Sequence, residues 1–230
     1  MKETTILREV EKVEILTLQD NFIEITAMDN SVIVSRARFL LDGEIKTSIR
    51  AEHGFSAVVK TTTAGRTRTL LFDFGFSEDG AAANSKAMGV DMGKVEAMAL
   101  SHGHSDHFGG FKKLVKMIGR EGIELVLHPA AFKRERYLKL PQDFKARFPQ
   151  MTRQEIEKAG VRLRETTEPL PLLDGDVLYL GEISRNTEFE KGMPHAFFMD
   201  KGIETWDPIE EDTGIVINIK GRGLVVLTGC

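Results

Sequence analysis

"LSHGHSDHFGG", residues 100–110, places three histidines and one aspartate within six positions. Imidazole and carboxylate groups are the usual protein ligands of a catalytic zinc or a similar divalent ion. Residues two positions apart in an extended loop can point the same way, so His102 and His104 can hold one ion. Asp106 and His107 can then face a second ion beside the first. Two ions about 3.5–4 Å apart can stabilise both the attacking and the leaving oxygen of a hydrolysis, so the stretch predicts a metal centre.

The residues before this loop and directly after it predict strands and one helix. Apolar or β-branched runs predict strands at 13–18, 55–61, 69–75, 95–100 and 123–129. The helical spacing of apolar residues from Phe108 to Ile118 predicts a helix that begins near Asp106 or His107 and ends at Gly119.

The second half of the chain predicts a helical stretch followed by further strands. Residues 130–164 are expected to be helical and basic, with a capping box formed by Thr152 and Glu155. Strand-like runs follow at 161–165, 176–180, 213–219 and 223–228, with a hairpin turn between the last two. Strands that lead, helices between them and strands that return indicate a mixed α/β (α+β) layered fold.

The overall composition restricts the class of protein. The chain has 230 residues, 41% of them hydrophobic, and a formal net charge of −4, which argues against a nucleic-acid partner. Its single cysteine, Cys230, excludes an internal disulfide. The first twenty residues lack a signal-peptide pattern, and no run approaches the ~18 apolar residues of a membrane span. We therefore expect a cytoplasmic protein without a membrane partner.

Charge is spread unevenly along the second half of the chain. Residues 111–164 hold fourteen Lys or Arg against six acidic residues, whereas residues 165–213 hold three against thirteen. Two interpretations stay open: two solvated faces that pair with each other, or a cationic rim that attracts an anionic substrate.

The histidine loop resembles the H-x-H-x-D-H signature of the metallo-β-lactamase superfamily. Further stretches resemble a subgroup labelled 7,8-dihydropterin-6-methyl-4-(β-D-ribofuranosyl)-aminobenzene-5'-phosphate synthase-like, namely "DN" (20–21), "EHGFS" (52–56), "LFDFG" (71–75), "HPAAF" (128–132), "GEISRNTEFE" (181–190) and "KGRGLVVLTGC" (220–230). The resemblance covers essentially the whole chain. It implies one αββα sandwich domain over 1–230, with a first half 1–128, a basic helical insertion about 130–164 and the start of a second half about 165–230.

The resemblance also implies roles for individual residues. His102 and His104 would hold one metal, and Asp106 and His107 the second, with zinc expected and manganese or iron as alternatives. A metal-bound hydroxide would be the nucleophile, and Asp106 would help to orient it as the catalytic residue. Asp73 matches the carboxylate that orients the histidine loop from behind, although it could instead cap the end of its strand.

Four further residues are candidates for binding substrate. Asn21 and His53 match motifs of the subgroup, and each could instead brace a loop. His128 precedes Pro129 at a strand end, which favours a structural role over contact with substrate. Arg185 could meet an anionic group.

The chain departs from the resembling family at its end. In relatives, "TGC" is followed by a small residue and then a metal-binding histidine, whereas this sequence ends at Cys230. A cleaved or cloned end, a gene broken by mutation and a stop codon that is read through are all open explanations. The sandwich is thus expected to be incomplete at its C-terminal side, with four of the expected ligands, weak or partial metal occupancy and association into a homo-oligomer.

The sequence therefore predicts a metal-dependent hydrolase that acts on a small anionic molecule, with phosphate- and pterin-containing compounds among the candidates. The alternative is a truncated, catalytically impaired relative that folds, associates or binds ligand without turnover. A nuclease is disfavoured by the acidic net charge. Redox chemistry at a di-iron site is disfavoured because neither extra carboxylate ligands nor a flavin partner is visible.

Overall fold

Six strands form the larger sheet, which carries the candidate ligands at one edge. The computed structural model describes residues 7–230, apart from residues 25, 28, 38, 39, 42, 43, 46, 47 and 191. The order across this sheet is β11, β8, β7, β6, β5, β2. Its strands are β2 (Lys12–Gln19), β5 (Ser56–Thr63), β6 (Arg66–Phe72), β7 (Ala97–Ala99), β8 (Glu124–Leu127) and β11 (Arg162–Glu165). The first three are antiparallel, and β6, β7, β8 and β11 run parallel.

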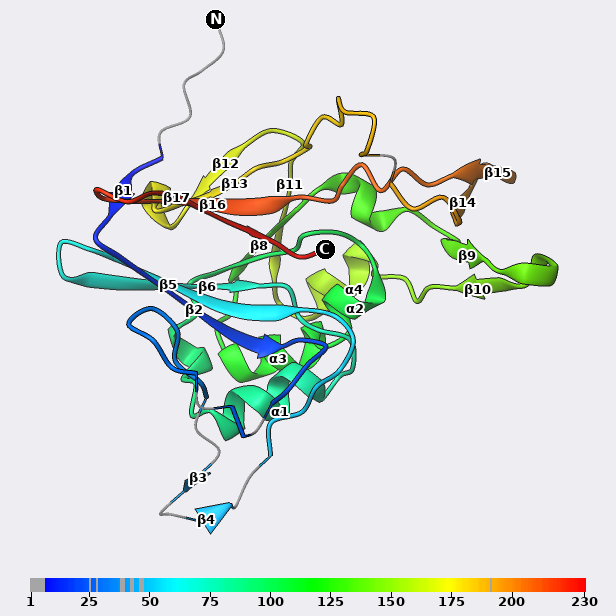
Figure 1. Cartoon of the computed structure of the whole chain (residues 1–230). Helices are drawn as coiled ribbons and strands as arrows, with labels where there is room; N and C mark the ends of the chain where they lie inside the picture. Colours follow the sequence, from blue (N-terminus) through cyan, green and yellow to red (C-terminus); the bar gives the residue numbers. More distant parts are fainter. Residues whose placement is uncertain are drawn as a thin grey trace, which may run out of the picture.

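A second sheet of five strands stacks on the first (Figure 1). Its strands are β1 (Glu9–Val10), β12 (Leu170–Leu172), β13 (Val177–Tyr179), β16 (Gly214–Ile219) and β17 (Gly223–Thr228). The hairpin predicted between the last two is confirmed, because β16 and β17 pair in register from Gly214–Thr228 to Ile219–Gly223. β1, near the start of the described residues, joins this sheet through a short parallel pairing with β16.

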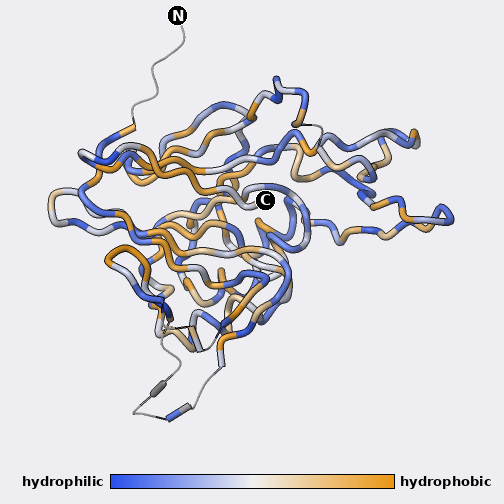
Figure 2. The backbone as a smooth tube through the Cα atoms, viewed as in Figure 1, coloured by the Kyte–Doolittle hydropathy of each residue, from blue (hydrophilic) through white to orange (hydrophobic). Residues whose placement is uncertain are grey.

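The period-2 alternation of the strands sends side chains of the first sheet into two separate cores. Val59, Leu70 and Phe72 point toward the second sheet and pack with Tyr179 and Ile215. Figure 2 shows hydrophobic segments where the two sheets face each other.

The opposite face of the first sheet packs on helices. Val58, Leu71 and Met98 join a core with side chains from α1 (Gly80–Ala87), α3 (Phe111–Ile118) and α4 (Arg153–Lys158). The predicted helix after the histidine loop is two elements, α2 (Ser105–Phe108) and α3, which ends at Gly119 as expected. The capping box of Thr152 and Glu155 at the start of α4 is confirmed.

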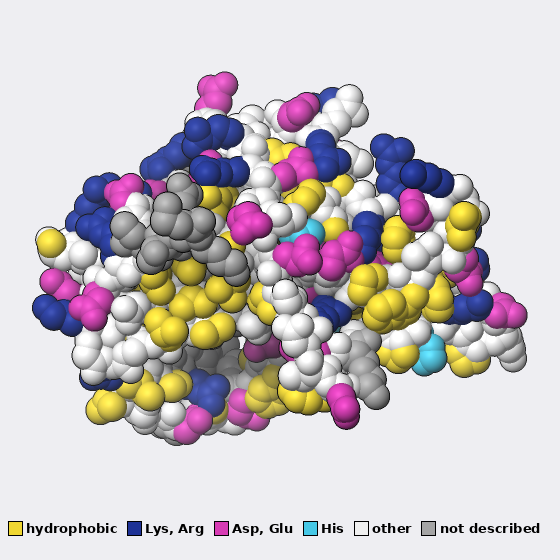
Figure 3. Space-filling view, turned by 90° about the horizontal axis from the view of Figure 1, so that it is seen from above, with side chains coloured by type: hydrophobic (Ala, Val, Ile, Leu, Met, Phe, Trp, Pro, Cys, Tyr) yellow, Lys and Arg dark blue, Asp and Glu magenta, His cyan; other side chains and the backbone are white. Residues whose placement is uncertain are grey.

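The described residues thus build a helical layer and two stacked sheets, which is the mixed α/β architecture that the sequence predicted. On the outer face of the second sheet, no helix from the described part of the chain is packed (Figure 1). Leu224 and Val226 of β17 are exposed there, and Figure 3, seen from this side, shows hydrophobic side chains on the surface.

The expectation of a basic helical insertion over about 130–164 is wrong for most of that segment. A four-stranded antiparallel sheet projects there, in the order β10 (Lys145–Arg147), β9 (Tyr137–Lys139), β14 (Ala196–Asp200), β15 (Ile203–Trp206). Its strands β9 and β14 pair through Tyr137 and Phe197, which are distant in sequence. The pairing of strands that are distant in sequence cannot be read from local composition. The basic composition of residues 130–164 therefore led to the wrong prediction of a helix. We refer to this sheet as the arm.

Short elements complete the described chain. They are β3 (Leu40–Leu41), β4 (Glu44–Ile45) and the 3-10 turns η1 (Met92–Lys94), η2 (Pro129–Phe132), η3 (Pro141–Asp143) and η4 (Leu173–Gly175). None of the helices in the described residues has the length and apolar character that crossing a lipid bilayer requires.

The packing between the two sheets predicts a large cost for a cavity in that layer. Leu70→Ala should lower the free energy of unfolding by about 2–5 kcal/mol, because Leu70 is fully buried. The matched control Leu224→Ala removes the same atoms from a side chain of β17 that is 65% exposed, and should change stability by less than about 0.5 kcal/mol. Urea unfolding of both variants measures the difference, and equal losses would contradict the layer assignment.

Candidate metal centre

Two parallel strands end side by side at the edge where the candidate ligands lie. Phe72 of β6 is in register with Ala99 of β7, so Asp73 and Ser101 follow at the same edge of the sheet. The backbone N–H of Asp73 still donates to the carbonyl of Ala99 at 3.0 Å. Asp73 then adopts a left-handed conformation with φ of 56°. A non-glycine residue in this region is strained, and such strain is concentrated at functional sites.

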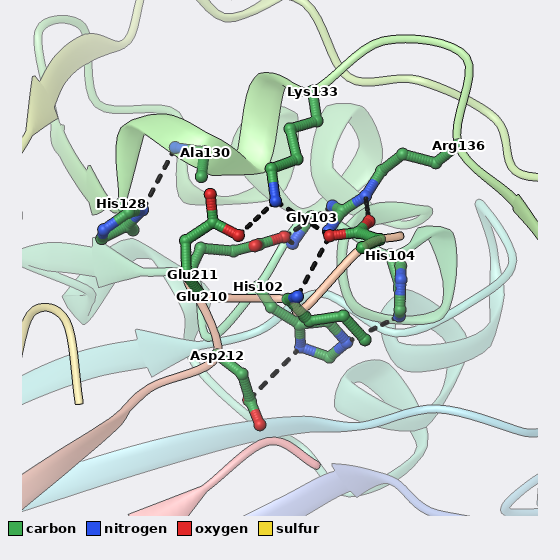
Figure 4. A network of polar contacts seen from close by, with 12 residues as sticks. His102, Gly103, His104, His128, Ala130, Lys133, Arg136, Glu210, Glu211 and Asp212 are labelled. Carbon is green, nitrogen blue, oxygen red and sulfur yellow. Dashed lines mark hydrogen bonds and ion pairs between the residues drawn. The ribbon is translucent and has the colours of Figure 1, made fainter. Parts of the chain in front are cut away.

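Two of the three imidazoles meet at their nitrogens. His102 Nε2 lies 3.1 Å from His104 Nδ1, and both rings are buried (Figure 4). Two nitrogens that bind one tetrahedral zinc at about 2.0–2.1 Å are about 3.4 Å apart, so this spacing fits a shared ion. The other nitrogen of His104, Nε2, is buried without a hydrogen-bond partner. Burial lowers the pKa of His102 well below its usual range and that of His104 to about 4, so both rings are neutral and can act as ligands.

The third imidazole, His107, lies between two carboxylates. Its Nδ1 is 2.8 Å from Asp73 Oδ2, and its Nε2 is 3.4 Å from Asp106 Oδ2. Burial disfavours the charged form of His107, but the hydrogen bonds to Asp106 and Asp73 outweigh it and raise the pKa of His107 to about 11. In the metal-free chain this ring is therefore an imidazolium, and a metal would have to displace the proton on Nε2.

Asp106 connects the histidine loop to two of the candidate substrate-binding residues. His53 Nε2 lies 3.3 Å from Asp106 Oδ2, and His53 Nδ1 lies 3.0 Å from Asn21 Oδ1. Burial raises the pKa of Asp106, yet its hydrogen bond with His107 prevails and the net pKa is lowered. The structure thus brings Asn21 and His53 together with Asp106. The His53 side chain is 73% exposed, so it is accessible from solvent.

The other two candidate substrate-binding residues are held by contacts outside the cluster. His128 is buried, and its Nδ1 accepts from the backbone N–H of Ala130 at 3.1 Å, which caps η2 (Figure 4). Arg185 donates through Nη2 to the carbonyl of Ile209 at 2.9 Å and through Nη1 to that of Pro208. These contacts fix local chain geometry.

A buried ion-pair network, which the sequence did not predict, supports the turn between His102 and His104. Arg136 pairs through Nε with Asp207 at 2.6 Å and through Nη1 with Glu211 at 2.5 Å. Glu211 Oε1 is 3.4 Å from the backbone nitrogen of Gly103. A Cβ on Gly103 would lie 2.4 Å from the carbonyl oxygen of Ala131, so this position requires glycine. The run of acids at 210–212 and the basic segment were the only signals of this network in the sequence.

Cys230, two residues after β17, and Asp212, two residues before β16, also lie close to the cluster. Ligand atoms of His102, His107 and Cys230 lie within 4.8 Å of one another. Asp212 Oδ1 lies 3.9 Å from His102 Nδ1, and burial raises the pKa of Asp212 to about 6. Imidazole nitrogens and a thiolate are preferred ligands of zinc, so the donor set fits a divalent ion. Neither Cys230 nor Asp212 was predicted as part of the centre.

Comparison with known proteins gives one family and several relatives. The family model of the metallo-beta-lactamase superfamily matches residues 50–182. The 7,8-dihydropterin-6-methyl-4-(beta-D-ribofuranosyl)-aminobenzene-5'-phosphate synthase of Methanocaldococcus jannaschii is 28% identical over 184 residues, which cover 78% of this chain and 61% of the synthase. An uncharacterized protein of the same organism is 25% identical over 197 residues, or 84% of this chain and 68% of that protein. The chain thus spans less than two thirds of the synthase.

A solved structure has the same fold. The crystal structure of a metal-dependent hydrolase of the beta-lactamase superfamily matches 95% of this chain and 66% of its own chain, with a TM-score of 0.65 and 22% sequence identity. At that identity the match establishes the arrangement of sheets and helices.

The imidazolium state of His107 predicts that metal binding is coupled to proton release. Because the pKa of His107 is about 11, Zn²⁺ at Nε2 has to displace a proton at any pH near neutrality. Below that pKa each pH unit downward increases the competing proton concentration tenfold, so the affinity should fall by about tenfold per unit for one proton. Calorimetric titration with Zn²⁺ in buffers of different ionisation enthalpy measures the proton count.

Asp73→Asn serves as the comparison for this titration. Loss of the Asp73 charge lowers the pKa of His107, so fewer protons should leave at pH 8. Affinity that does not change with pH in the unaltered chain would contradict the assignment of His107 as a ligand.

Proposed function

Because the chain belongs to the metallo-β-lactamase superfamily, we propose that it is a metal-dependent hydrolase that acts on a small anionic molecule. The observation that carries this proposal is the convergence of three buried imidazoles and one carboxylate at a single edge of the first sheet. At this edge His102 Nε2 and His104 Nδ1 face each other 3.1 Å apart, a spacing that fits two ligands of one ion.

We assign the ligands in two pairs. His102 Nε2 and His104 Nδ1 face one ion, and Asp106 with His107 Nε2 faces a second. Zinc is the proposed metal because the first pair offers only nitrogen; manganese and iron accept the same donors. When bound, such an ion supplies Lewis acidity and brings the pKa of water down to about 7.

The remaining roles belong to the chain's own side chains. Asp73 accepts a hydrogen bond from His107 Nδ1 and thereby turns Nε2 toward the ion site. Asp106, with its lowered pKa, stays ionised and can orient an attacking water through its carboxylate. His53, exposed beside Asp106 and held by Asn21, is placed to contact substrate.

The choice of an anionic substrate rests on a relative and on one local feature. The matched synthase is named for a product that contains a pterin and a phosphate group. In this chain the exposed Arg147 adjoins Phe148, whose ring stacks on His104 with centroids 4.5 Å apart.

Several other basic residues of 111–164 are neutralised by acidic partners. Lys133 and Arg136 pair with Asp207, and Lys139 and Lys145 pair with Glu204. Pairing of the two charged segments thus explains part of the charge asymmetry, and Arg147 is the base we propose for attracting substrate.

The test is the loss of hydrolysis on removal of one proposed ligand. His104→Ala in the zinc-loaded chain should reduce turnover of chromogenic phosphate monoesters and diesters by more than about a hundredfold, because even partners behind the ligands contribute about 10- to 100-fold. The exposed His195→Ala is the matched control and should retain the activity of the unaltered chain. Activity is followed by nitrophenolate release, and the fold by circular dichroism. Equal activity in both variants would refute the proposed centre.

A further inference from the structure

Ser101 lies at the centre of the buried contacts behind the candidate ligands. Its Oγ is 2.7 Å from Asp73 Oδ2, 3.0 Å from His102 Nδ1 and 3.4 Å from His107 Nδ1. Its backbone N–H donates to Asp73 Oδ1 at 2.7 Å. Ser101 and Asp73 are fully buried, and both imidazoles are nearly so.

The directions of these hydrogen bonds follow from counting protons. An ionised carboxylate only accepts, so the single hydroxyl proton of Ser101 is donated to Asp73 Oδ2. The Ser101 oxygen then has lone pairs left, and it can bind His102 Nδ1 only if that nitrogen carries a proton. A neutral imidazole has one N–H, so His102 Nε2 must hold a lone pair. That lone pair faces His104 Nδ1, which is the side where the proposed ion lies.

We infer that Ser101 is a positioning residue that selects the Nδ1–H tautomer of His102 and so exposes Nε2 as a metal ligand. The inference deepens the proposed function and rests on it, because it assigns a device that prepares one ligand of the same centre. Asp73 acts directly on His107 and only through Ser101 on His102. One buried carboxylate thereby fixes the proton positions of two candidate ligands.

The end of β17 closes this arrangement from the second sheet. A Cβ on Gly229 would lie 2.2 Å from Ser101 Oγ and 2.4 Å from Asp73 Oδ2, which shows how closely the Gly229 backbone covers the pair. Such close cover leaves little space for a water that could replace the hydroxyl. Asp212 is the competing acceptor for His102 Nδ1, but at 3.9 Å it is beyond hydrogen-bond distance.

The experiment reads the tautomers directly in the metal-free protein. Long-range ¹H–¹⁵N correlation spectra of the ¹⁵N-labelled full chain, dialysed against chelator, report which ring nitrogen of each histidine carries the proton. In the unaltered chain His102 should be the Nδ1–H form. In Ser101→Ala it should shift toward Nε2–H, donated to His104, while His107 keeps its Nδ1 proton because Asp73 binds it directly. Ser101→Thr retains the hydroxyl and should restore the original spectrum of His102.

Two results would overturn the inference. One is a His102 that is already Nε2–H in the unaltered chain, and the other is a His102 that stays Nδ1–H in Ser101→Ala, which would make Asp212 the acceptor. A loss of His107 Nδ1–H together with that of His102 would indicate general disruption of the loop and would also count against a specific role of Ser101.

Zinc affinity gives the second measurement. Competition with a chromogenic chelator should show a tenfold to hundredfold weaker affinity for Ser101→Ala, with recovery in Ser101→Thr. Equal affinity in all three proteins would refute the positioning role. Failure of the proposed function is separate, since a chain that shows these tautomers and affinities but does not hydrolyse any ester would retain the role of Ser101 in a metal site without hydrolase activity.

Discussion

The fully buried carboxylate of Asp73 is the constraint on which the geometry of the centre depends. A carboxylate removed from water is unfavourable unless its oxygens are hydrogen-bonded, and Asp73 accepts from the backbone and hydroxyl of Ser101 and from His107. These bonds hold Ser101, which follows β7, against Asp73, which follows β6. The left-handed backbone of Asp73 is the conformational cost of this arrangement, and the dense hydrogen bonding around the carboxylate offsets it.

A second buried charge links the arm to the same turn. Arg136, near the start of the arm, can be buried because Asp207 and Glu211 neutralise it, and removing one partner of such a network would leave an uncompensated charge. Glu211 also reaches the nitrogen of Gly103 between two candidate ligands. The position of the arm and the position of the His102–His104 turn are therefore set by the same three charged side chains.

The sequence predicted the elements that depend on neighbouring residues, and it missed the contacts between residues that are distant in the sequence. The H-x-H-x-D-H pattern, the strands that flank it and the cap at Thr152 depend on neighbouring residues, and they appear in the structure as expected. The arm depends on pairing of Tyr137 with Phe197, and the ion-pair network depends on contacts of Arg136 with Asp207 and Glu211. In both cases the partners are about 60 or more positions apart in the sequence, and contacts at such separations produce no periodic pattern in the sequence. Ser101 was overlooked for a different reason, since a serine beside a histidine is ordinary until the fold brings Asp73 against it.

The charges around the centre explain why it suits a divalent cation rather than an anion. Asp73, Asp106 and Glu211 surround the imidazoles, and Asp212 joins them above a pH of about 6. Arg136 pairs with Asp207 and Glu211, and the His107 imidazolium lies between Asp73 and Asp106, so the carboxylates near the imidazoles outnumber the cations. Without a metal, burial disfavours the charged His107, but its hydrogen bonds to Asp106 and Asp73 outweigh burial and raise its pKa to about 11. A divalent ion brings twice that charge to the same carboxylates, and the displaced proton leaves Nε2 free to bind it.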